Sequence, residues 1–425
     1  MRVLSDVKIK EYVKKTPIKI EPFSENILGL ARDFIGNGIV FDWYPYMQDF
    51  SGKFVYEMFN RFHITPEHKV LDPYCGSGTT LLTAKLLGID STGIDFNPFC
   101  CFISKVKTNW EIPPNELQQQ ARRLLGKISS IRVLSDSRIE PPKMPNLDRW
   151  MAKKIVYKVL AIKNLIYDIQ DENIKDFFLL ALASILREVS NITLALNVTI
   201  NSIKTDAPVF SIFANKVHKM VEDYRQVRLS IEKPGSTQVF RKDSRHIDLE
   251  EVFDFVITSP PYPNDIDYVN QTRMELFFLD LITNKNEFRD LKRGMITSDA
   301  IYYVWAKNNS ELVEDIPEIT GIVKRMKESY KNKGWGWDYP KMVSEYFGDM
   351  LLSLDSLYDV MAPGGYCVYV VGDAAFNGIK IPADNLIKVL AEKVGFSNCI
   401  VERSRSRSAS SHRIPLRESL VIFRK

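Results

Sequence analysis

The chain has 425 residues, of which 45% are hydrophobic and 26% charged, and its 57 basic and 53 acidic residues give a net charge of +4. This composition is that of a folded globular protein and excludes a disordered chain. Residues 1–19 lack the pattern of a signal peptide, and the longest nearly apolar run, Phe177 to Ile185, is too short to span a bilayer. We therefore expect a cytoplasmic protein without a membrane segment.

The cysteines favour the same compartment. They form no Cys-x-x-Cys pair and have no accompanying histidine cluster, so we expect no metal site. An odd number of cysteines without a secretion signal fits a reducing cytoplasm, in which buried thiols act as small apolar groups. The five are Cys75, Cys100, Cys101, Cys367 and Cys399.

The first elements predict a nucleotide-binding βαβ unit. Residues Lys69 to Asp72 form a short apolar strand that ends at a glycine-rich turn. Thr80 to Leu87 follows as a helix, and Ser91 to Asp95 as a second strand that ends in an acid. This order of elements is used to bind nucleotide cofactors.

A helical segment then interrupts the strand pattern, from Pro114 to about Lys233. It has long amphipathic stretches and lacks the Val- and Ile-rich runs that would continue a sheet. Pro234-Gly235 closes it as a turn. We interpret it as an inserted helical subdomain, with helices expected at Asn115–Ile128, Trp150–Ile169, Ile174–Val189 and Ala214–Leu229.

Strands resume after the helical segment. A loop-and-helix region, Asn264 to Tyr358, separates the next two strands from the last ones, and Ala383–Val394 is a helix. The Ser- and Arg-rich segment Arg403–His412 is expected to be a mobile connection. The later strands are predicted at Thr237–Phe240, Phe253–Thr258, Gly365–Val371, Ser397–Glu402 and Ser419–Phe423.

The strand count is therefore seven, and helices alternate with the first five strands. This pattern predicts an α/β fold with a mostly parallel, doubly wound, Rossmann-like sheet. The expected parts are an N-terminal half of the α/β domain (1–113), the helical subdomain (114–235), and a C-terminal half (236–425) that contains the loop insertion 264–358.

The turn after the first strand reads Asp72-Pro73-Tyr74-Cys75-Gly76-Ser77-Gly78-Thr79-Thr80. Two glycines let the backbone turn tightly and approach a ligand, and the following helix points its N–H groups at that ligand. No lysine follows the second glycine, so the turn is not expected to cradle a triphosphate.

Acids at strand ends extend this candidate cofactor site. Asp95 is placed to accept both ribose hydroxyl hydrogens, as in dinucleotide enzymes, so that NAD stays open on these features alone. Asp243 follows the next strand and is either an acceptor for an adenine amino group or an ordinary surface acid.

The segment Thr258-Ser259-Pro260-Pro261-Tyr262 ends an apolar strand and is the candidate catalytic block. Consecutive prolines fix φ and remove two N–H donors, so the preceding carbonyls are held rigidly at the ligand-binding end of the strand. Ser259 and the Pro260 carbonyl can accept hydrogen bonds from a planar amino group, and Tyr262 offers a ring on which a base can stack. A strand that merely ends in a Pro-Pro turn is the alternative.

The last thirty residues are more basic than the rest, with seven basic residues against two acidic ones. Clustered cations are what phosphate binding requires, although a solvated basic surface explains the charge equally well. The candidate nucleic-acid-binding residues are Arg403, Arg405, Arg407 and Arg413.

The glycine block, Gly93-Ile94-Asp95 and the Ser-Pro-Pro-Tyr block together resemble the amino-methyltransferases of restriction–modification systems. The Ser-Pro-Pro-Tyr form is typical of the cytosine-N4 branch, whereas an Asp or Asn before Pro-Pro-Tyr is commoner in adenine-N6 enzymes. The resemblance implies the seven-stranded methyltransferase fold, with S-adenosylmethionine as cofactor and the segment from Tyr46 to Phe54 closing over its methionine end. It implies that Ser259, Pro260, Pro261 and Tyr262 hold the base, and that Asp72, Tyr74, Cys75, Gly76, Ser77, Gly78, Thr79, Asp95 and Asp243 bind the cofactor.

The implied activity is direct methyl transfer to the N4 amino group of a flipped cytosine in duplex DNA, with a restriction endonuclease as a further partner. Adenine-N6 methylation of DNA and guanine-N2 methylation of RNA remain alternatives, and a non-catalytic nucleic-acid-binding scaffold is a third. We expect the helical segment to recognise the target, with the Trp335–Tyr339 loop as the competing candidate.

Overall fold

The computed structural model describes residues 25–46, 49–131, 140–193, 198–200, 203–300, 302–408 and 414–425. Seven strands of this part form one sheet, in the order β10-β11-β7-β6-β1-β2-β5. The bounds of these strands are β1 Lys69–Asp72, β2 Asp90–Asp95, β5 Thr237–Arg241, β6 Phe253–Thr258, β7 Met361–Gly372, β10 Ser397–Ser408 and β11 Pro415–Arg424.

The sheet has the predicted Rossmann-like character. β5, β2, β1, β6 and β7 are parallel, and β11 runs antiparallel between β7 and β10. Helices α4 (Thr79–Leu86) and α5 (Pro98–Thr108) follow β1 and β2. Parallel neighbours require such crossovers, which is why strands and helices alternate along the sequence. The seven-stranded, mostly parallel α/β fold expected from the sequence is confirmed.

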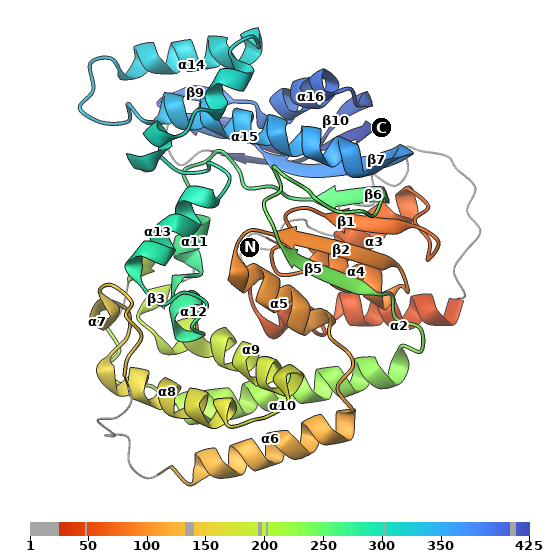
Figure 1. Cartoon of the computed structure of the whole chain (residues 1–425), viewed down its shortest axis with the longest axis vertical. Helices are drawn as coiled ribbons and strands as arrows, with labels where there is room; N and C mark the ends of the chain where they lie inside the picture. The colour runs from red at the N-terminus through yellow and green to blue at the C-terminus, as the bar shows by residue number, and fades with distance from the viewer. Residues whose placement is uncertain are drawn as a thin grey trace.

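Two apolar cores lie on the two faces of this sheet. Successive side chains of a strand point to opposite faces, so Phe255 and Ile257 of β6 join one core while Val256 joins the other. The first core contains the helices α2 (Glu25–Gly36), α3 (Gly52–Arg61), α4 and α5. The second contains α14 (Pro317–Tyr330), α15 (Tyr339–Val360) and α16 (Ala383–Val394). Figure 1 shows α14, α15 and α16 at the top of the molecule and α4 and α5 lower down.

The segment predicted to be helical is helical. Its helices are α6 (Pro114–Ser129), α7 (Leu147–Trp150), α8 (Lys153–Tyr167), α9 (Glu172–Val189) and α10 (Val209–Ser230). Asp171 caps α9 by accepting a hydrogen bond from the backbone N–H of Ile174. These helices form a layer at the bottom of Figure 1, and their apolar residues continue the first core of the sheet. The division of the chain into domains stays a prediction.

Two small antiparallel ribbons were not expected. β3 (Ile192–Thr193) pairs with β4 (Thr199–Ile200) inside the helical segment. β8 (Ala374–Phe376) pairs with β9 (Ile379–Ile381) directly after β7. Strands of two or three residues are too short to show the alternation that identifies a strand in a sequence.

The region between β6 and β7 contains short helices before α14 and α15. They are α11 (Tyr268–Gln271), α12 (Arg273–Phe278), α13 (Lys285–Gly294), η2 (Tyr302–Ala306) and η3 (Asn309–Val313). Figure 1 shows α11, α12 and α13 to the left of the sheet, above α7 and α8 of the helical layer. No helix in the described ranges is long and apolar enough to cross a membrane.

The end of the chain differs from the expectation. Residues 403–408 belong to strand β10, whose register with β11 continues to Ser408 opposite Pro415, so they are not a connection. Residues 409–412 lie outside the described residues. β10 is an edge strand, and charged residues are typical of such edges because they discourage pairing with other chains. Arg61 of α3 donates to both carboxylate oxygens of Glu402 and anchors this edge.

Two helical glycines predict opposite effects on stability. A Cβ at Gly348 of α15 would lie 1.9 Å from the Asn309 carbonyl oxygen, whereas a Cβ at Gly126 of α6 would meet no atom within 4 Å. We expect Gly348→Ala to lower the free energy of unfolding by about 1–3 kcal/mol. The matched control Gly126→Ala should raise it by about 0.5–1 kcal/mol, because alanine is the better helix former. Chemical denaturation measures both, and a Gly348→Ala protein as stable as the wild type would contradict this packing.

Candidate functional site

Three parallel strands end side by side and bring the candidate residues together. Asp72 ends β1, Asp95 ends β2 and Thr258 ends β6. One carboxylate oxygen of Asp72 accepts a hydrogen bond from the Thr258 hydroxyl at 2.6 Å and another from the Tyr74 backbone N–H at 3.1 Å. This contact joins the glycine block to the Ser-Pro-Pro-Tyr block across 186 residues of sequence.

The glycine turn depends on both of its glycines. Gly76 and Gly78 have φ of +51° and +82°, in the left-handed region that favours glycine. A Cβ at Gly78 would also lie 2.8 Å from the Ser104 hydroxyl oxygen of α5. The Ser104 hydroxyl donates to the Gly76 carbonyl at 3.0 Å, so α5 holds the turn in place.

The Asp95 carboxylate closes the other side of this turn. It accepts the Gly76 backbone N–H at 3.0 Å and the Asn97 backbone N–H at 2.8 Å. Burial raises the pKa of Asp95 to about 6, against these hydrogen bonds that favour the charged form. Each carboxylate oxygen can accept more than one hydrogen bond, so acceptor capacity remains for a ligand.

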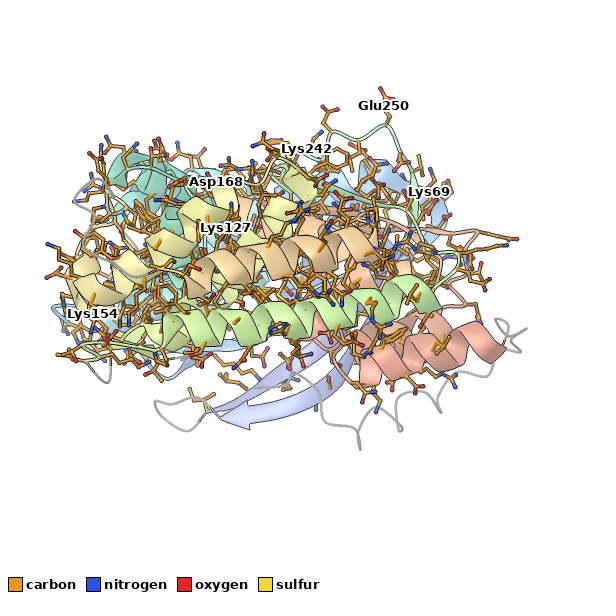
Figure 2. All side chains as sticks on the ribbon, turned by 90° about the horizontal axis from the view of Figure 1, so that it is seen from below. Lys69, Lys127, Lys154, Asp168, Lys242 and Glu250 are labelled. Carbon is orange, nitrogen blue, oxygen red and sulfur yellow. The ribbon has the colours of Figure 1, made fainter. Side chains whose placement is uncertain are left out.

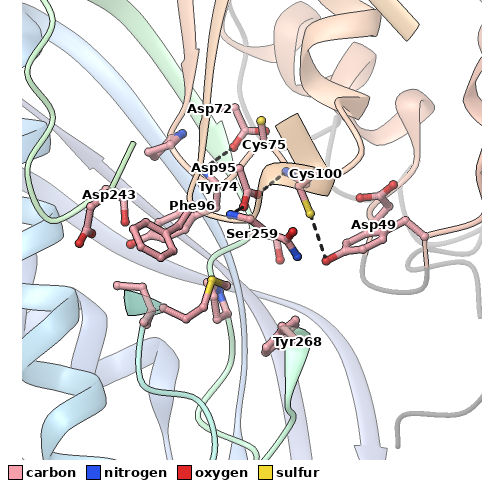
Figure 3. A pocket seen from close by; sticks show the side chains of 18 of the residues that line it. Asp49, Asp72, Tyr74, Cys75, Asp95, Phe96, Cys100, Asp243, Ser259 and Tyr268 are labelled. Carbon is pink, nitrogen blue, oxygen red and sulfur yellow. Dashed lines mark hydrogen bonds between the residues drawn. The ribbon is translucent and has the colours of Figure 1, made fainter. Parts of the chain in front are cut away.

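These residues line one elongated pocket, shown in Figure 3. Asp243 and Asp49 lie at its opposite ends, with Asp95, Tyr74, Phe96 and Ser259 between them. Nine of the predicted site residues line it, namely Asp72, Tyr74, Cys75, Gly76, Thr79, Asp95, Asp243, Ser259 and Pro261. Four predicted residues are not among the lining residues, namely Ser77, Gly78, Pro260 and Tyr262.

Ser77 instead supports the Asp49 end of the pocket. Its hydroxyl donates to the Asp49 carboxylate and accepts a hydrogen bond from the buried Lys107 ammonium at 3.2 Å. Burial raises the pKa of Asp49, and burial lowers the pKa of Lys107 to about 8. At this end of the pocket, the positive charge of Lys107 therefore offsets part of the cost of burying the Asp49 carboxylate.

At the other end, Asp243 is held by Arg245. The guanidinium donates to both Asp243 oxygens, at 2.7 to 3.1 Å, and to the Gly294 carbonyl at 2.6 Å. It also donates to Asp349 of α15 at 2.8 Å, a carboxylate with 0% exposure. Burial alone would raise the pKa of Asp349, but the cations Lys307 and Arg245 outweigh it and lower that pKa. The Asp243 carboxylate is thus fixed in position beside the pocket.

The Ser-Pro-Pro-Tyr block contributes Ser259 and Pro261 to the lining of the same pocket. Ser259 is half-buried at its wall, and its hydroxyl lies 3.5 Å from the Tyr262 hydroxyl. The Tyr262 hydroxyl donates to Glu418 of β11 at 3.1 Å, and its backbone N–H donates to the Tyr268 hydroxyl at 3.0 Å. These contacts orient the Tyr262 ring beside the pocket instead of inside it.

The predicted basic residues are only partly described. Arg403 is exposed on β10, whereas the side chains of Arg405 and Arg407, and all of Arg413, lie outside the described residues. The backbone of Arg405 pairs with that of Glu418, the partner of Tyr262. This end of the sheet therefore runs beside the Ser-Pro-Pro-Tyr block.

Several lining residues were missed by the sequence reasoning. Phe96 and Asn97 directly follow Asp95, and that position was the signal that could have identified them. Tyr268 and residues 294–296 come from the region after β6 and carry no motif. A Cβ at Gly294 would lie 2.2 Å from the Phe96 ring, so only glycine allows this segment to close on that ring.

The described ranges contain no group of three or more His, Cys, Asp or Glu side chains arranged to hold a metal ion. All five cysteines are free and buried, and burial raises the pKa of Cys75 and Cys100 beside the pocket. Both side chains therefore stay as neutral thiols in the pocket wall.

Asp72 makes stability depend on pH. Burial raises its pKa to about 7, whereas an unfolded aspartate has a pKa of about 3.9. Between these values the folded chain keeps a proton that the unfolded chain has lost, so the free energy of unfolding falls as pH rises. Asp72→Asn should reduce this fall between about pH 4 and about pH 7, with the remainder due in part to Asp95. Denaturation midpoints at both ends of that range test it, and an unchanged difference would refute the assignment.

A sequence profile described as DNA methylase matches residues 56–106, which contain β1, the glycine turn, α4, β2 and most of α5. Among solved structures, TehB from Haemophilus influenzae aligns with 88% of this chain and 62% of that chain, at 10% identity and a TM-score of 0.28. That score is too low to carry an argument.

Curated relatives match over most of their length. The chain is 25% identical to the Type II methyltransferase M.MvaI of Kocuria varians, over 78% of this chain and 76% of the relative. It is 25% identical to the Type II methyltransferase M.BsoBI of Geobacillus stearothermophilus, over 92% of this chain and 86% of the relative. These matches confirm the resemblance that the motifs predicted, to the amino-methyltransferase family of restriction–modification systems.

Proposed function

We propose that the protein is a DNA methyltransferase that transfers a methyl group from S-adenosylmethionine to the exocyclic amino group of a base, with cytosine N4 as the favoured target. The observation that carries the proposal is the Thr258–Asp72 hydrogen bond, because it brings the cofactor-type turn and the amino-binding block to one pocket. The Type II methyltransferases among the relatives support the class of reaction.

The pocket fits the chemistry of this cofactor. Burial disfavours the charged form of three carboxylates of this pocket, Asp49, Asp72 and Asp95, and raises their pKa values. A nearby cation would stabilise the charged form, and the cofactor supplies two cationic groups, a sulfonium and an ammonium. Asp95 would accept the ribose hydroxyls, Asp243 the adenine amino group, and the Asp49 end would hold the methionine portion. When bound, this cofactor supplies an electrophilic methyl group.

The Ser259 region would activate the amino group. An aromatic amine is a poor nucleophile because its lone pair is conjugated with the ring. Ser259 Oγ and the Pro260 carbonyl would accept its two hydrogens, turn the nitrogen toward tetrahedral geometry and localise that lone pair toward the methyl group. Tyr262, oriented by Glu418 and Tyr268, would stack on the extruded base.

Serine at position 259 favours cytosine, because the related adenine-N6 enzymes more often have Asp or Asn before Pro-Pro-Tyr. The other parts of the proposal follow from the family. The substrate is duplex DNA, the cellular setting is a restriction–modification system with a cognate endonuclease, and the basic strand β10 with Arg403, Arg405 and Arg407 contributes phosphate contacts near the block.

The methylated product tests the target base. Unmethylated genomic DNA, incubated with the protein and S-adenosylmethionine and then digested to nucleosides, should yield N4-methylcytosine by mass spectrometry. N6-methyladenine instead would keep the mechanism and change the base. Methylation confined to RNA would refute the DNA assignment, and cofactor binding without any methylation would favour a non-catalytic scaffold.

Two substitutions separate the cofactor side from the base side. Asp95→Asn keeps the shape of the side chain and removes its charge, so it should weaken S-adenosylmethionine binding by about 1–3 kcal/mol in isothermal titration. Tyr262→Ala should leave that affinity nearly unchanged and lower methylation efficiency about ten- to a hundredfold, because the base no longer has a ring on which to stack.

Tyr262→Phe is the control, since the ring remains and the decrease should be smaller. Equal cofactor affinity in wild-type and Asp95→Asn proteins would reject the cofactor role of Asp95. Full methylation by Tyr262→Ala would reject the stacking role of Tyr262.

A further inference from the structure

Three of the six tryptophans of the chain are half-exposed or more, and all three lie close together. Trp305, Trp335 and Trp337 are 51%, 58% and 58% exposed, whereas Trp43, Trp110 and Trp150 are buried. The exposed three belong to η2 and to the loop 331–338 between α14 and α15. We call α14, this loop and Trp305 the tryptophan arm. Large exposed aromatic groups mark interaction surfaces when they gather in one place.

The arm holds its indole rings in a defined arrangement. The Trp305 indole N–H donates to Asp338 at 2.7 Å, and the Trp305 and Trp337 rings lie 5.5 Å apart at 31°. Gly336 has φ of +79°, and a Cβ there would lie 2.2 Å from the Tyr330 ring. The backbone at Gly336 therefore passes directly over the Tyr330 ring, and the neighbouring Trp335 and Trp337 side chains are exposed to solvent.

The arm is rich in cations. Residues 324–341 contain six basic and two acidic residues, so this short segment alone matches the net charge of the whole chain. The Lys333 ammonium lies 5.4 Å from the Trp335 ring centre. Exposed cations interleaved with exposed aromatic rings fit a partner that has phosphates and bases. The exposed basic residues of the arm are Lys324, Arg325, Lys327, Lys331 and Lys333.

The arm is attached to the candidate catalytic loop. Tyr339, the first residue of α15 after the loop 331–338, donates its hydroxyl to Asp265 at 3.0 Å, and Asp265 lies three residues after Tyr262. The Tyr339 ring also stacks on Phe376 of the β8–β9 hairpin at 4.6 Å. Figure 1 shows the loop between α14 and α15 extending beyond the end of the sheet. A duplex whose target base entered the pocket would pass close to this surface.

The helical layer is the weaker candidate. Figure 2 looks onto its outer face, on which the labelled Lys127, Lys154 and Asp168 carry both signs of charge. Lys154 and Lys158 form ion pairs with Asp206. Trp150, the tryptophan of this layer, is 8% exposed.

We infer that the tryptophan arm is a DNA-binding surface, on which the indole rings of Trp335 and Trp337 contact bases beside the extruded target and the lysines contact phosphates. This inference rests on the proposed function and assigns DNA binding to a particular part of the chain.

The first test measures binding of a fluorescein-labelled, random-sequence duplex by anisotropy. Trp335→Ala combined with Trp337→Ala should weaken binding about tenfold or more, because both stacking platforms are removed. Trp335→Phe with Trp337→Phe should restore part of the affinity, because aromatic rings remain. The same duplex should quench the tryptophan fluorescence of the wild-type protein more strongly than that of the double alanine variant.

The second test separates the arm from the helical layer by charge. Replacing Lys324, Lys327 and Lys331 with Gln should weaken binding and lower the slope of log affinity against log salt, by about 0.9 for each phosphate that is no longer neutralised. The matched control replaces Arg122, Arg123 and Lys127, three exposed cations of α6, with Gln. It removes the same charge and should leave affinity and slope nearly unchanged.

The outcomes distinguish the two proposals. If the wild-type protein binds the duplex and methylates DNA while the arm variants bind as tightly as wild type, the arm inference is wrong and the proposed function stands. Loss of duplex binding in the α6 variant alone would show that the helical layer, and not the arm, binds the DNA. If the wild-type protein neither binds the duplex nor methylates unmethylated genomic DNA, the proposed function itself fails. Unchanged S-adenosylmethionine affinity shows that each variant is folded.

Discussion

The candidate site depends on one buried hydrogen bond, from the Thr258 hydroxyl to the Asp72 carboxylate. It connects the ends of β6 and β1, neighbouring parallel strands whose motifs lie far apart in the sequence. A carboxylate that is 2% exposed is costly unless its oxygens have donors, and the Tyr74 backbone N–H supplies a second one. The same hydrogen bond therefore fixes the start of the glycine turn and the start of the Ser-Pro-Pro-Tyr block, and the pocket between them follows from it.

Charge is the second constraint on the pocket. Burial raises the pKa values of Asp49, Asp72 and Asp95, and the buried cation Lys107 contacts Ser77 on the Asp49 side. A folded chain that keeps three desolvated acids in one crevice gives up stability there, as is typical of sites that bind or react. A positively charged ligand would recover part of that free energy on binding. Under the proposed function, this is the physical reason for an acid-rich crevice at the sulfonium cofactor.

The features that could be predicted from the sequence are those that a local residue pattern determines. β1, β6 and the glycine turn were recognisable because an apolar run, two glycines and an acid fall within a few residues. Residues 294–296 and Tyr268 were not, because only tertiary packing brings them to the pocket. The Arg/Ser alternation of 403–408 looked like a connection by composition, yet the backbone pairing with β11 makes it an edge strand. Asp243 was found from its strand-end position, but its partner Arg245 depends on a helix more than a hundred residues away.

That helix, α15, connects the separate parts of the site. Near its start Tyr339 contacts Asp265 of the candidate catalytic loop, in its middle Asp349 accepts from Arg245 beside Asp243, and further along Ser353 accepts from the Tyr74 hydroxyl at 2.6 Å. An α-helix changes little in length, so these three contacts have fixed spacings along one rigid rod. The Asp243 end of the pocket, the glycine block and the tryptophan arm are thereby all held by the same helix. A duplex that displaced the arm would also displace the start of α15. The same helix contacts Tyr74 through Ser353, and it contacts Asp243 indirectly, because Asp349 binds Arg245. Under the two proposals, α15 therefore connects the DNA-binding surface mechanically to the cofactor pocket.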